Sequence, residues 1–112
     1  LQHAPTPQGD PAALEIHALA QARGISLWCG GMLETGVGRA LNVALATLPN
    51  FVLPNDISAT DRYFKADIAY PPFKLTPRGT IPVPQGAGLG VEVDEERLRR
   101  EALEVVRLVL RR

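Results

Sequence analysis

The chain has 112 residues, enough for one domain at most, and its 46% hydrophobic content supplies a core and argues against disorder. Twelve basic and twelve acidic residues cancel, so no net field attracts nucleic acid or an anionic membrane. No apolar run approaches the roughly 20 residues that span a bilayer, the N-terminus lacks a signal-peptide pattern, and Cys29 has no second cysteine to pair with, so we expect a cytoplasmic protein.

The start of the chain is unusual. The only methionine is Met32, and the first residue is Leu1. We therefore expect that the polypeptide was cut, truncated or entered partway through a longer gene. Residues 1–9 are rich in proline and polar residues and show no apolar period, so we expect an atypical stretch there.

The first expected helix follows this stretch. Asp10 is a suitable N-cap, Pro11 suits the first helical position, and Gly24 predicts the C-terminal end. Residues 25–29 form a short apolar run, which is typical of a strand buried on both faces. The apolar residues of the helix recur at helical spacing and comprise Leu14, Ala18 and Ala22, with Ile16 and Leu19 beside them.

A second helix is expected after Gly30 and Gly31, with Pro49 ending it. Residues 51–53 then form another short apolar strand. Helices and strands that alternate with short connections indicate an α/β fold with parallel strands. The apolar face predicted for the second helix comprises Val37, Leu41, Ala44, Leu45 and Leu48.

The second half has a different character. Residues 56–92 are rich in proline and glycine, and a hairpin is predicted from strands at 73–76 and 80–83 around the turn at residues 77–79. Asp94 predicts the cap of a final amphipathic helix, with favourable i,i+4 pairs between Glu95 and Arg99 and between Glu96 and Arg100. Its expected apolar seam comprises Leu98, Ala102, Val105 and Val109, widened by Leu103, Val106 and Leu110.

Candidate binding residues follow the two predicted strands, because function gathers at the carboxyl ends of parallel strands. Gly30 and Gly31 let the backbone approach a ligand, and N–H groups at the start of the next helix suit a carboxylate. Asp56 follows the second strand. The plainer interpretations are a tight turn for the glycine pair and a turn-forming residue for Asp56.

Other conspicuous residues favour structural roles. His17 lies on a helix and is expected to be a surface or packing residue. Cys29 is expected to act as a small hydrophobe, since no neighbouring His or Lys would activate its thiol. Residues 86–90 (GAGLG) are only superficially similar to a nucleotide fingerprint, because no helix follows them. No cluster of Asp, Glu, His or Cys has metal-ligand spacing.

Several dispersed motifs resemble one known family. Residues 25–42 (ISLWCGGMLETGVGRALN) resemble the seventh strand and following helix of o-succinylbenzoate synthases and N-acylamino acid racemases. Residues 46–51 (ATLPNF) continue the match into the eighth strand, and residues 81–84 (IPVP) and 88–98 (GLGVEVDEERL) resemble the tail that returns to the capping domain. The resemblance is to the muconate-lactonising subgroup of the enolase superfamily.

This resemblance implies the C-terminal portion of an enolase-type (β/α) barrel, with strands 7 and 8, their helices and a tail toward an α+β cap. It also implies the chemistry: a lysine removes a proton next to a carboxylate while Mg²⁺ stabilises the enolate. Gly30, Gly31 and Met32 would line the pocket near the carboxylate or side chain of the substrate. Asp56 would sit at the end of the eighth strand, and Glu34 would support the loop.

The departures from the family pattern concern catalysis. The family's paired lysines and three acidic metal ligands precede anything present here, and its second catalytic lysine would fall near His3. We therefore expect no catalytic residue and no metal bound by this chain alone, although the parent family uses Mg²⁺. We also expect residues 1–9 to be foreign to the family. The expected divisions are 1–9, a partial barrel at 10–65, a tail at 66–93 and a helix at 94–112.

Three hypotheses remain open from the sequence. The first is a C-terminal enzyme segment, inactive alone, whose small-molecule carboxylate substrate binds only in the complete enzyme. The second is a non-catalytic interaction fragment, because open strand edges and apolar faces favour a homo-oligomer or a complementing N-terminal fragment. The third is an independent small α/β domain, which a cooperative melt of the lone monomer would favour.

Overall fold

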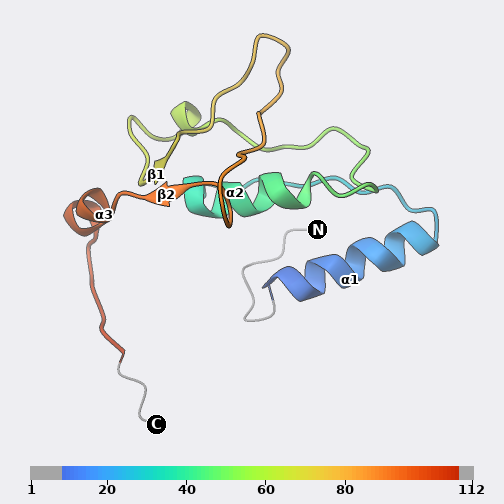
Figure 1. The fold of residues 1–112 in the computed structure, drawn as a ribbon, viewed down its shortest axis with the longest axis horizontal. Helices are drawn as coiled ribbons and strands as arrows, with labels where there is room; N and C mark the ends of the chain where they lie inside the picture. Colours follow the sequence, from blue (N-terminus) through green and yellow to red (C-terminus); the bar gives the residue numbers. More distant parts are fainter. Residues whose placement is uncertain (1–8, 109–112) are drawn as a thin grey trace.

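The computed structural model describes residues 9–108 and arranges them as three α-helices, one 3-10 helix and one short antiparallel strand pair (Figure 1). No helix among these residues combines the length and apolarity that a bilayer crossing requires. The elements in chain order are α1 (Gly9–Ala22), α2 (Gly36–Leu45), the 3-10 helix η1 (Thr60–Arg62), β1 (Ala69–Tyr70), β2 (Glu92–Val93) and α3 (Glu95–Glu101).

Helix α1 ends where the sequence predicts. Gly24 adopts φ +67, the Ile25 N–H donates to the Ala20 carbonyl at 2.9 Å, and the Gly24 N–H donates to the Gln21 carbonyl at 3.2 Å. This is the left-handed glycine termination that satisfies the last helical carbonyls. The start was predicted two residues late, because the described helix starts at Gly9 and includes Asp10, whereas Pro11 was predicted as its first residue.

The predicted apolar stripe of α1 is wrong about burial. Leu14 and Leu19 are exposed, and the buried positions are His17 and Ala20. The His17 ring stacks on Phe51 with ring centroids 6.0 Å apart, and its Nε2 accepts a hydrogen bond from the Asn50 N–H at 3.1 Å. His17 is therefore a packing residue, as predicted, and it attaches α1 to the segment after α2.

The two predicted strands run side by side in the same direction, but they are less regular than expected. The Leu53 N–H donates to the Leu27 carbonyl at 3.2 Å, and Gly30 and Asp56 form an isolated parallel bridge. Neither segment has the ladder of a regular strand in the described part of the chain. The expected burial on both faces is wrong, because Trp28 is 49% exposed and Val52 is 62% exposed.

Helix α2 begins after the glycine pair and ends at Leu45, four residues before Pro49. Its buried face differs from the predicted one, because it consists of Gly36, Arg39, Ala40 and Val43. This face packs on the tail of the chain instead of on the paired segments. Ala40, Val43 and Phe73 form the core cluster, with partly buried Ile57, Ile81 and Val91 around it.

The predicted hairpin keeps its turn but has no strands. The Thr76 N–H donates to the Thr80 carbonyl at 2.8 Å, and Gly79 adopts φ +76, while no strand is assigned at 73–76 or 80–83. The strand pair lies elsewhere: β1 and β2 pair antiparallel, with Ala69 opposite Val93. These strands have only two residues each, so they are too short to show the alternation of apolar and polar residues by which a strand is predicted.

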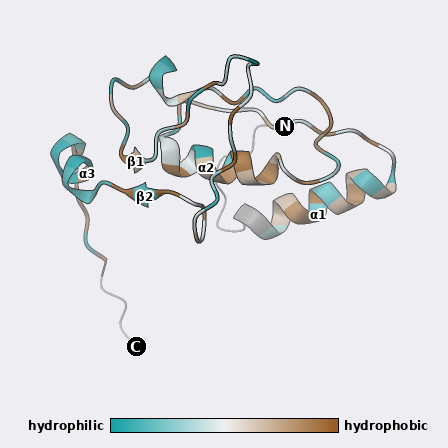
Figure 2. Cartoon of the chain, turned by 45° about the horizontal axis from the view of Figure 1, so that its top comes forward, coloured by the Kyte–Doolittle hydropathy of each residue, from teal (hydrophilic) through white to brown (hydrophobic). Residues whose placement is uncertain are grey.

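Helix α3 starts as predicted and ends early. The Asp94 side chain accepts from the Arg97 N–H at 2.9 Å, and the two predicted i,i+4 ion pairs form at 3.1 and 3.3 Å. The helix stops at Glu101, is largely hydrophilic (Figure 2), and is followed by an extended stretch in which Leu103 is fully exposed. The predicted seam is therefore wrong in the described residues, because α3 buries no side chain and Leu98 itself is 43% exposed; Val109 and Leu110 lie outside the described residues.

Candidate functional site

The predicted binding residues meet where the two parallel segments end. The Gly31 N–H donates to the Asp56 carbonyl at 2.5 Å, and the Asp56 N–H donates to the Cys29 carbonyl at 2.9 Å. Met32 follows directly, so Gly30, Gly31, Met32 and Asp56 lie in one place. We call residues 30–34 the glycine loop. The structure thus brings together residues that are 24 to 26 positions apart in the sequence.

Gly31 allows this close approach because it has no side chain. A Cβ at Gly31 would lie 2.6 Å from the Asp56 carbonyl oxygen and 3.3 Å from the Ile57 Cα, both of which are backbone atoms. A Cβ at Gly30 would meet only the Trp28 ring, at 3.3 Å. Any side chain at Gly31 would therefore push the two segments apart, whereas Gly30 has a neighbour that can move.

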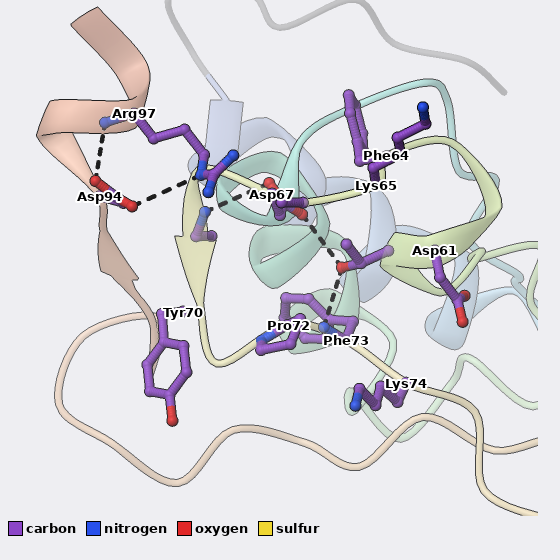
Figure 3. Close-up of a pocket in the computed structure, with 13 residues that line it drawn as sticks. Asp61, Phe64, Lys65, Asp67, Tyr70, Pro72, Phe73, Lys74, Asp94 and Arg97 are labelled. Atoms are coloured by element: carbon purple, nitrogen blue, oxygen red, sulfur yellow. Dashed lines mark hydrogen bonds and ion pairs between the residues drawn. The ribbon is translucent and has the colours of Figure 1, made fainter. Parts of the chain in front are cut away.

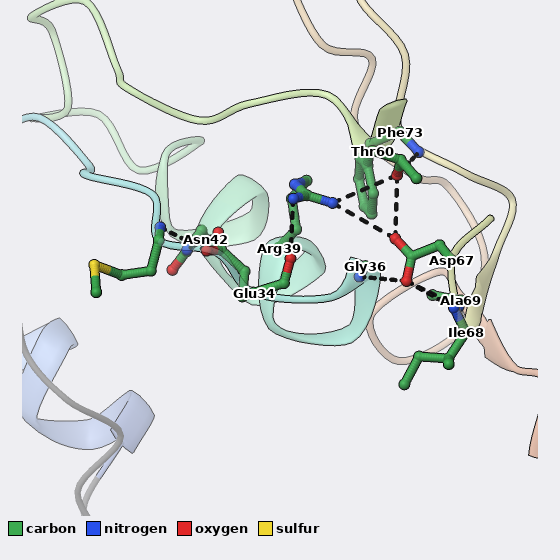
Figure 4. Close-up of polar contacts among 10 residues, drawn as sticks. Glu34, Gly36, Arg39, Asn42, Thr60, Asp67, Ile68, Ala69 and Phe73 are labelled. Carbon is green, nitrogen blue, oxygen red and sulfur yellow. Dashed lines mark hydrogen bonds and ion pairs between the residues drawn. The ribbon is translucent and has the colours of Figure 1, made fainter. Parts of the chain in front are cut away.

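Glu34 holds the glycine loop from within. Its Oε2 accepts from the Met32 N–H at 2.5 Å, and its Oε1 accepts from Asn42 Nδ2 at 2.9 Å (Figure 4). Asn42 lies on α2, so the carboxylate ties the loop to the helix that follows it. The supporting role expected of Glu34 agrees with these contacts.

The hydrogen bonds leave a particular surface free. The N–H groups of Gly31 and Met32 already have partners within the chain. The Met32 side chain, by contrast, is 58% exposed, and Asp56 is also exposed. A ligand at the glycine loop would therefore meet the apolar side chain of Met32 and the glycine backbone, with the carboxylate of Asp56 beside them.

The first N–H group of α2 already has a hydrogen-bond partner in the chain, whereas the N–H groups there were expected to point toward the ligand space at the glycine loop. The Gly36 N–H donates to Asp67 Oδ1 at 2.9 Å. Thr35, the residue before the helix, makes no capping hydrogen bond with its own side chain. Asp67 therefore takes the place of a cap from 31 residues further along the chain, and its negative charge suits the helix N-terminus.

A buried polar network extends from Asp67, and sequence reasoning missed it. Arg39 Nη1 lies 3.5 Å from Asp67 Oδ2 and 3.4 Å from Thr60 Oγ1, and its Nη2 donates to the Glu34 carbonyl at 2.9 Å. Thr60 Oγ1 also donates to Asp67 at 3.2 Å and accepts from the Phe73 N–H at 3.1 Å. The Arg39 side chain is 0% exposed. Nothing in the apolar pattern marks an arginine in the GVGRALN run as buried.

Two titratable side chains near the site have shifted pKa values. Burial, and then the charge of Glu34, raise the pKa of the Cys29 thiol, which agrees with the predicted inert role. A hydrogen bond with Ser58, and then one with Arg62, lower the pKa of Tyr63. The charge of Asp56 opposes this lowering of the Tyr63 pKa.

Two open hollows lie beside Asp67. They hold about 420 and 620 Å³, and residues 64–67 and Arg97 line both; Figure 3 shows the first of them. Arg97 is held by Asp94 at the start of α3, and none of Gly30, Gly31, Met32 and Asp56 lines either hollow. The hollows therefore do not belong to the predicted binding site.

The side chains of the site do not fit a magnesium ion. Residues 9–108 contain no group of three His, Cys, Asp or Glu side chains that could hold a metal. Asp56 is the single acidic side chain that is free at the glycine loop, since Glu34 is engaged by the Met32 N–H and Asn42. Mg²⁺ prefers several oxygen ligands in octahedral geometry, which one carboxylate does not provide.

Comparison with known proteins identifies the family. Residues 9–97 match the family described as Enolase C-terminal domain-like. An N-succinylamino acid racemase from Amycolatopsis sp. is 60% identical over 79 residues, which cover 70% of this chain and 21% of that protein. An o-succinylbenzoate synthase from Bacillus subtilis (strain 168) is 49% identical over 88 residues, which cover 79% of this chain and 24% of that protein.

The solved structures agree with the sequence matches. An enolase superfamily member from Listeria innocua superposes with a TM-score of 0.77 at 47% identity, covering 82% of this chain and 24% of that one. The chain thus spans about a quarter of the length of these relatives, and its α/β architecture is that of the enolase C-terminal domain. The chain belongs to the enolase superfamily, in its muconate-lactonising subgroup.

Proposed function

We propose that this chain is the C-terminal segment of an enzyme of the o-succinylbenzoate synthase or N-acylamino acid racemase type, and that it contributes substrate-binding residues but has no activity alone. The observation that carries the proposal is the parallel bridge between Gly30 and Asp56. It joins a glycine loop to the end of a second segment in a sequence 60% identical to a racemase and 49% identical to a synthase.

In the proposed enzyme the two paired segments are strands 7 and 8 of a (β/α) barrel. Support comes from their parallel direction and from the position of the candidate residues at their carboxyl ends, where barrel enzymes bind substrates. The tail from residue 66 onward would lead to the capping domain. The exposed side chains of Trp28 and Val52 would then be covered by the rest of the barrel.

The glycine loop is suited to the apolar part of the substrate. Since the N–H groups of Gly31 and Met32 are already hydrogen-bonded, they do not serve a substrate carboxylate. The exposed Met32 side chain is flexible and polarisable, which favours contact with a hydrophobic substituent. Asp56 would accept a hydrogen bond from an N–H or O–H group of the substrate.

Proton abstraction depends on groups outside residues 9–108. The superfamily implies a lysine base and Mg²⁺, and the described residues offer no site for the ion. The proposed role of this chain is therefore confined to binding and orienting the substrate, which is a small carboxylate. A cytoplasmic location remains part of the proposal, in keeping with a free Cys29.

A transplant tests the proposal. Residues 11–97 replace the matching segment of the Bacillus subtilis o-succinylbenzoate synthase, and the chimera is assayed for that enzyme's reaction with Mg²⁺. We expect activity from the chimera and none from the 112-residue chain alone. A chimera that folds by circular dichroism but does not turn over would refute the binding role, and turnover by the lone chain would refute its inactivity.

Two variants of the chimera sharpen the assignment. Met32→Ala should raise KM roughly tenfold or more for a substrate with a large apolar group, which is within the range for a lost hydrophobic contact. Leu33→Ala is the matched control, because Leu33 is also exposed and has no assigned contact with the substrate. Equal effects of the two substitutions would remove Met32 from the binding site.

The alternative is a non-catalytic fragment that assembles with another polypeptide. Exposed apolar side chains on the paired segments favour it: Ile25 and Trp28 on the first, and Val52 and Leu53 on the second. A complementing N-terminal fragment or a second copy would cover them. Size-exclusion chromatography with light scattering, with and without an N-terminal fragment of the synthase, separates assembly from a cooperative monomer.

A further inference from the structure

Arg39 is a buried cation in a helix whose other buried residues are small or apolar. Burial of a guanidinium is costly unless its N–H groups find partners, and a well-packed apolar residue of similar volume is often as stable. Packing alone therefore does not account for an arginine at this position. The contacts of Nη1 and Nη2 give the arginine a more specific role, because they join Asp67 on one side to the Glu34 carbonyl on the other (Figure 4).

The contact with Glu34 has a consequence for the glycine loop. Arg39 Nη2 holds the Glu34 carbonyl at 2.9 Å, which fixes the backbone from which the Glu34 side chain extends. The carboxylate of that side chain then reaches the Met32 N–H at 2.5 Å. One residue is thus held at its backbone and holds the loop with its side chain.

We propose that Arg39 is a positioning residue. It fixes the position of Glu34 and, through Glu34, the conformation of the glycine loop, while Asp67 fixes the position of Arg39. Asp67 is suited to this because both of its oxygens contact α2, one at the first residue of the helix and one at Arg39. Oδ1 accepts from the Gly36 N–H at 2.9 Å, and Oδ2 lies 3.5 Å from the guanidinium. The place of the loop is thereby tied to residue 67 of the tail. That the loop binds substrate rests on the function proposed above.

Arginine suits the task because its planar fork presents donors in two directions at once. Nη1 faces Thr60 and Asp67, and Nη2 faces the Glu34 carbonyl. A lysine keeps the charge but has a single nitrogen, so it is expected to retain Asp67 and to lose the Glu34 carbonyl. Arg39→Lys therefore separates the positioning role from the burial of a paired charge.

The test measures amide hydrogen exchange on the full 112-residue chain by ¹⁵N NMR. In Arg39→Lys we expect the Met32 amide to exchange roughly ten- to a hundredfold faster, the effect of losing a charge-assisted hydrogen bond, while the amides of α1 change little. Glu34→Gln should do the same, since a carboxamide has one oxygen for two donors. In the double variant the effects should not add, because both act on one contact. Arg99→Lys, in the exposed pair with Glu95, is the matched control and should leave Met32 unchanged.

Two results of the exchange experiment would overturn the proposal. If Arg39→Lys accelerates Met32 no more than the amides of α1, or if the two substitutions add independently, Arg39 is a packing residue only and the proposal is overturned. The exchange measurement needs no substrate. An inactive chimera would therefore refute the proposed function without affecting the proposed positioning of the glycine loop by Arg39 and Glu34. In an active chimera, Arg39→Lys should raise KM by a larger factor than it lowers kcat, because the loop is proposed to bind and not to react.

Discussion

Replacing Gly31 with alanine tests whether the approach of the two paired segments holds the site together. The new Cβ would lie 2.6 Å from the Asp56 carbonyl oxygen and 3.3 Å from the Ile57 Cα. These are backbone atoms, so the segments have to separate, and the hydrogen bond from the Gly31 N–H to that carbonyl is lost. Overpacking costs about 1–3 kcal/mol, and the lost hydrogen bond costs about 1 kcal/mol. We therefore expect the free energy of unfolding to fall by about 2–4 kcal/mol.

The neighbouring glycine supplies the control. Gly30→Ala makes the same chemical change, and its Cβ meets only the side chain of Trp28, at 3.3 Å. Both substitutions reduce the entropy of the unfolded chain by about the same 0.4–1 kcal/mol, so their difference isolates the clash. Urea unfolding followed by circular dichroism at 222 nm gives both values from the shift in midpoint. If the two variants unfold at the same urea concentration, the close approach of the segments does not exist in solution.

Two further changes probe the buried network and the thiol. Asp67→Ala leaves Arg39 buried without its countercharge and should lower the free energy of unfolding by about 3–5 kcal/mol. The control Glu95→Ala removes one partner of an exposed pair and should lower it by less than about 1 kcal/mol. Equal losses of the two variants in a urea melt would contradict the buried pair. The raised pKa of Cys29 means that its thiolate fraction at a given pH is smaller than that of a free thiol, so half-maximal alkylation by iodoacetamide should require a higher pH in the folded chain than in the unfolded chain. Glu34→Gln should move that pH downward, because the charge of Glu34 contributes to the shift, and no movement would show that burial acts alone.

The sequence predicts well the features that are encoded locally. Gly24 ends α1 and Asp94 begins α3, because both act through bonds to residues a few positions away. The ends of the two parallel segments were also predictable, since the glycine pair and Asp56 follow apolar runs of strand length. The motif resemblance added the family, which residues 9–97 confirm.

Features that depend on tertiary partners could not be predicted. Whether an apolar run is buried is decided by what packs on it, and in the described chain nothing covers Trp28 or Val52 enough to bury them. Helix α3 ends at Glu101 for the same reason, because an isolated short helix is marginal without an apolar surface beneath it. The sequence pattern beyond Glu101 describes a helical seam, and the structure gives that seam no surface to bury against.

The buried polar network shows a different limit of prediction from sequence. Arg39 lies 21 positions before Thr60 and 28 positions before Asp67, and no spacing rule relates the three residues. Thr35 is a residue type that caps helices well, so nothing local in the sequence pointed to an acceptor from elsewhere, although in the structure its side chain makes no capping hydrogen bond.

The distribution of burial explains why the network matters more here than in a larger core. The fully buried apolar cluster of the described chain contains Ala40, Val43 and Phe73, all between α2 and the tail. The paired segments and the glycine loop lie outside it, so apolar packing does not fix the loop. Hydrogen bonds have to do so, and they reach the loop from the core through Arg39 and Glu34. The loop is therefore expected to keep its shape only while the junction between α2 and the tail stays intact.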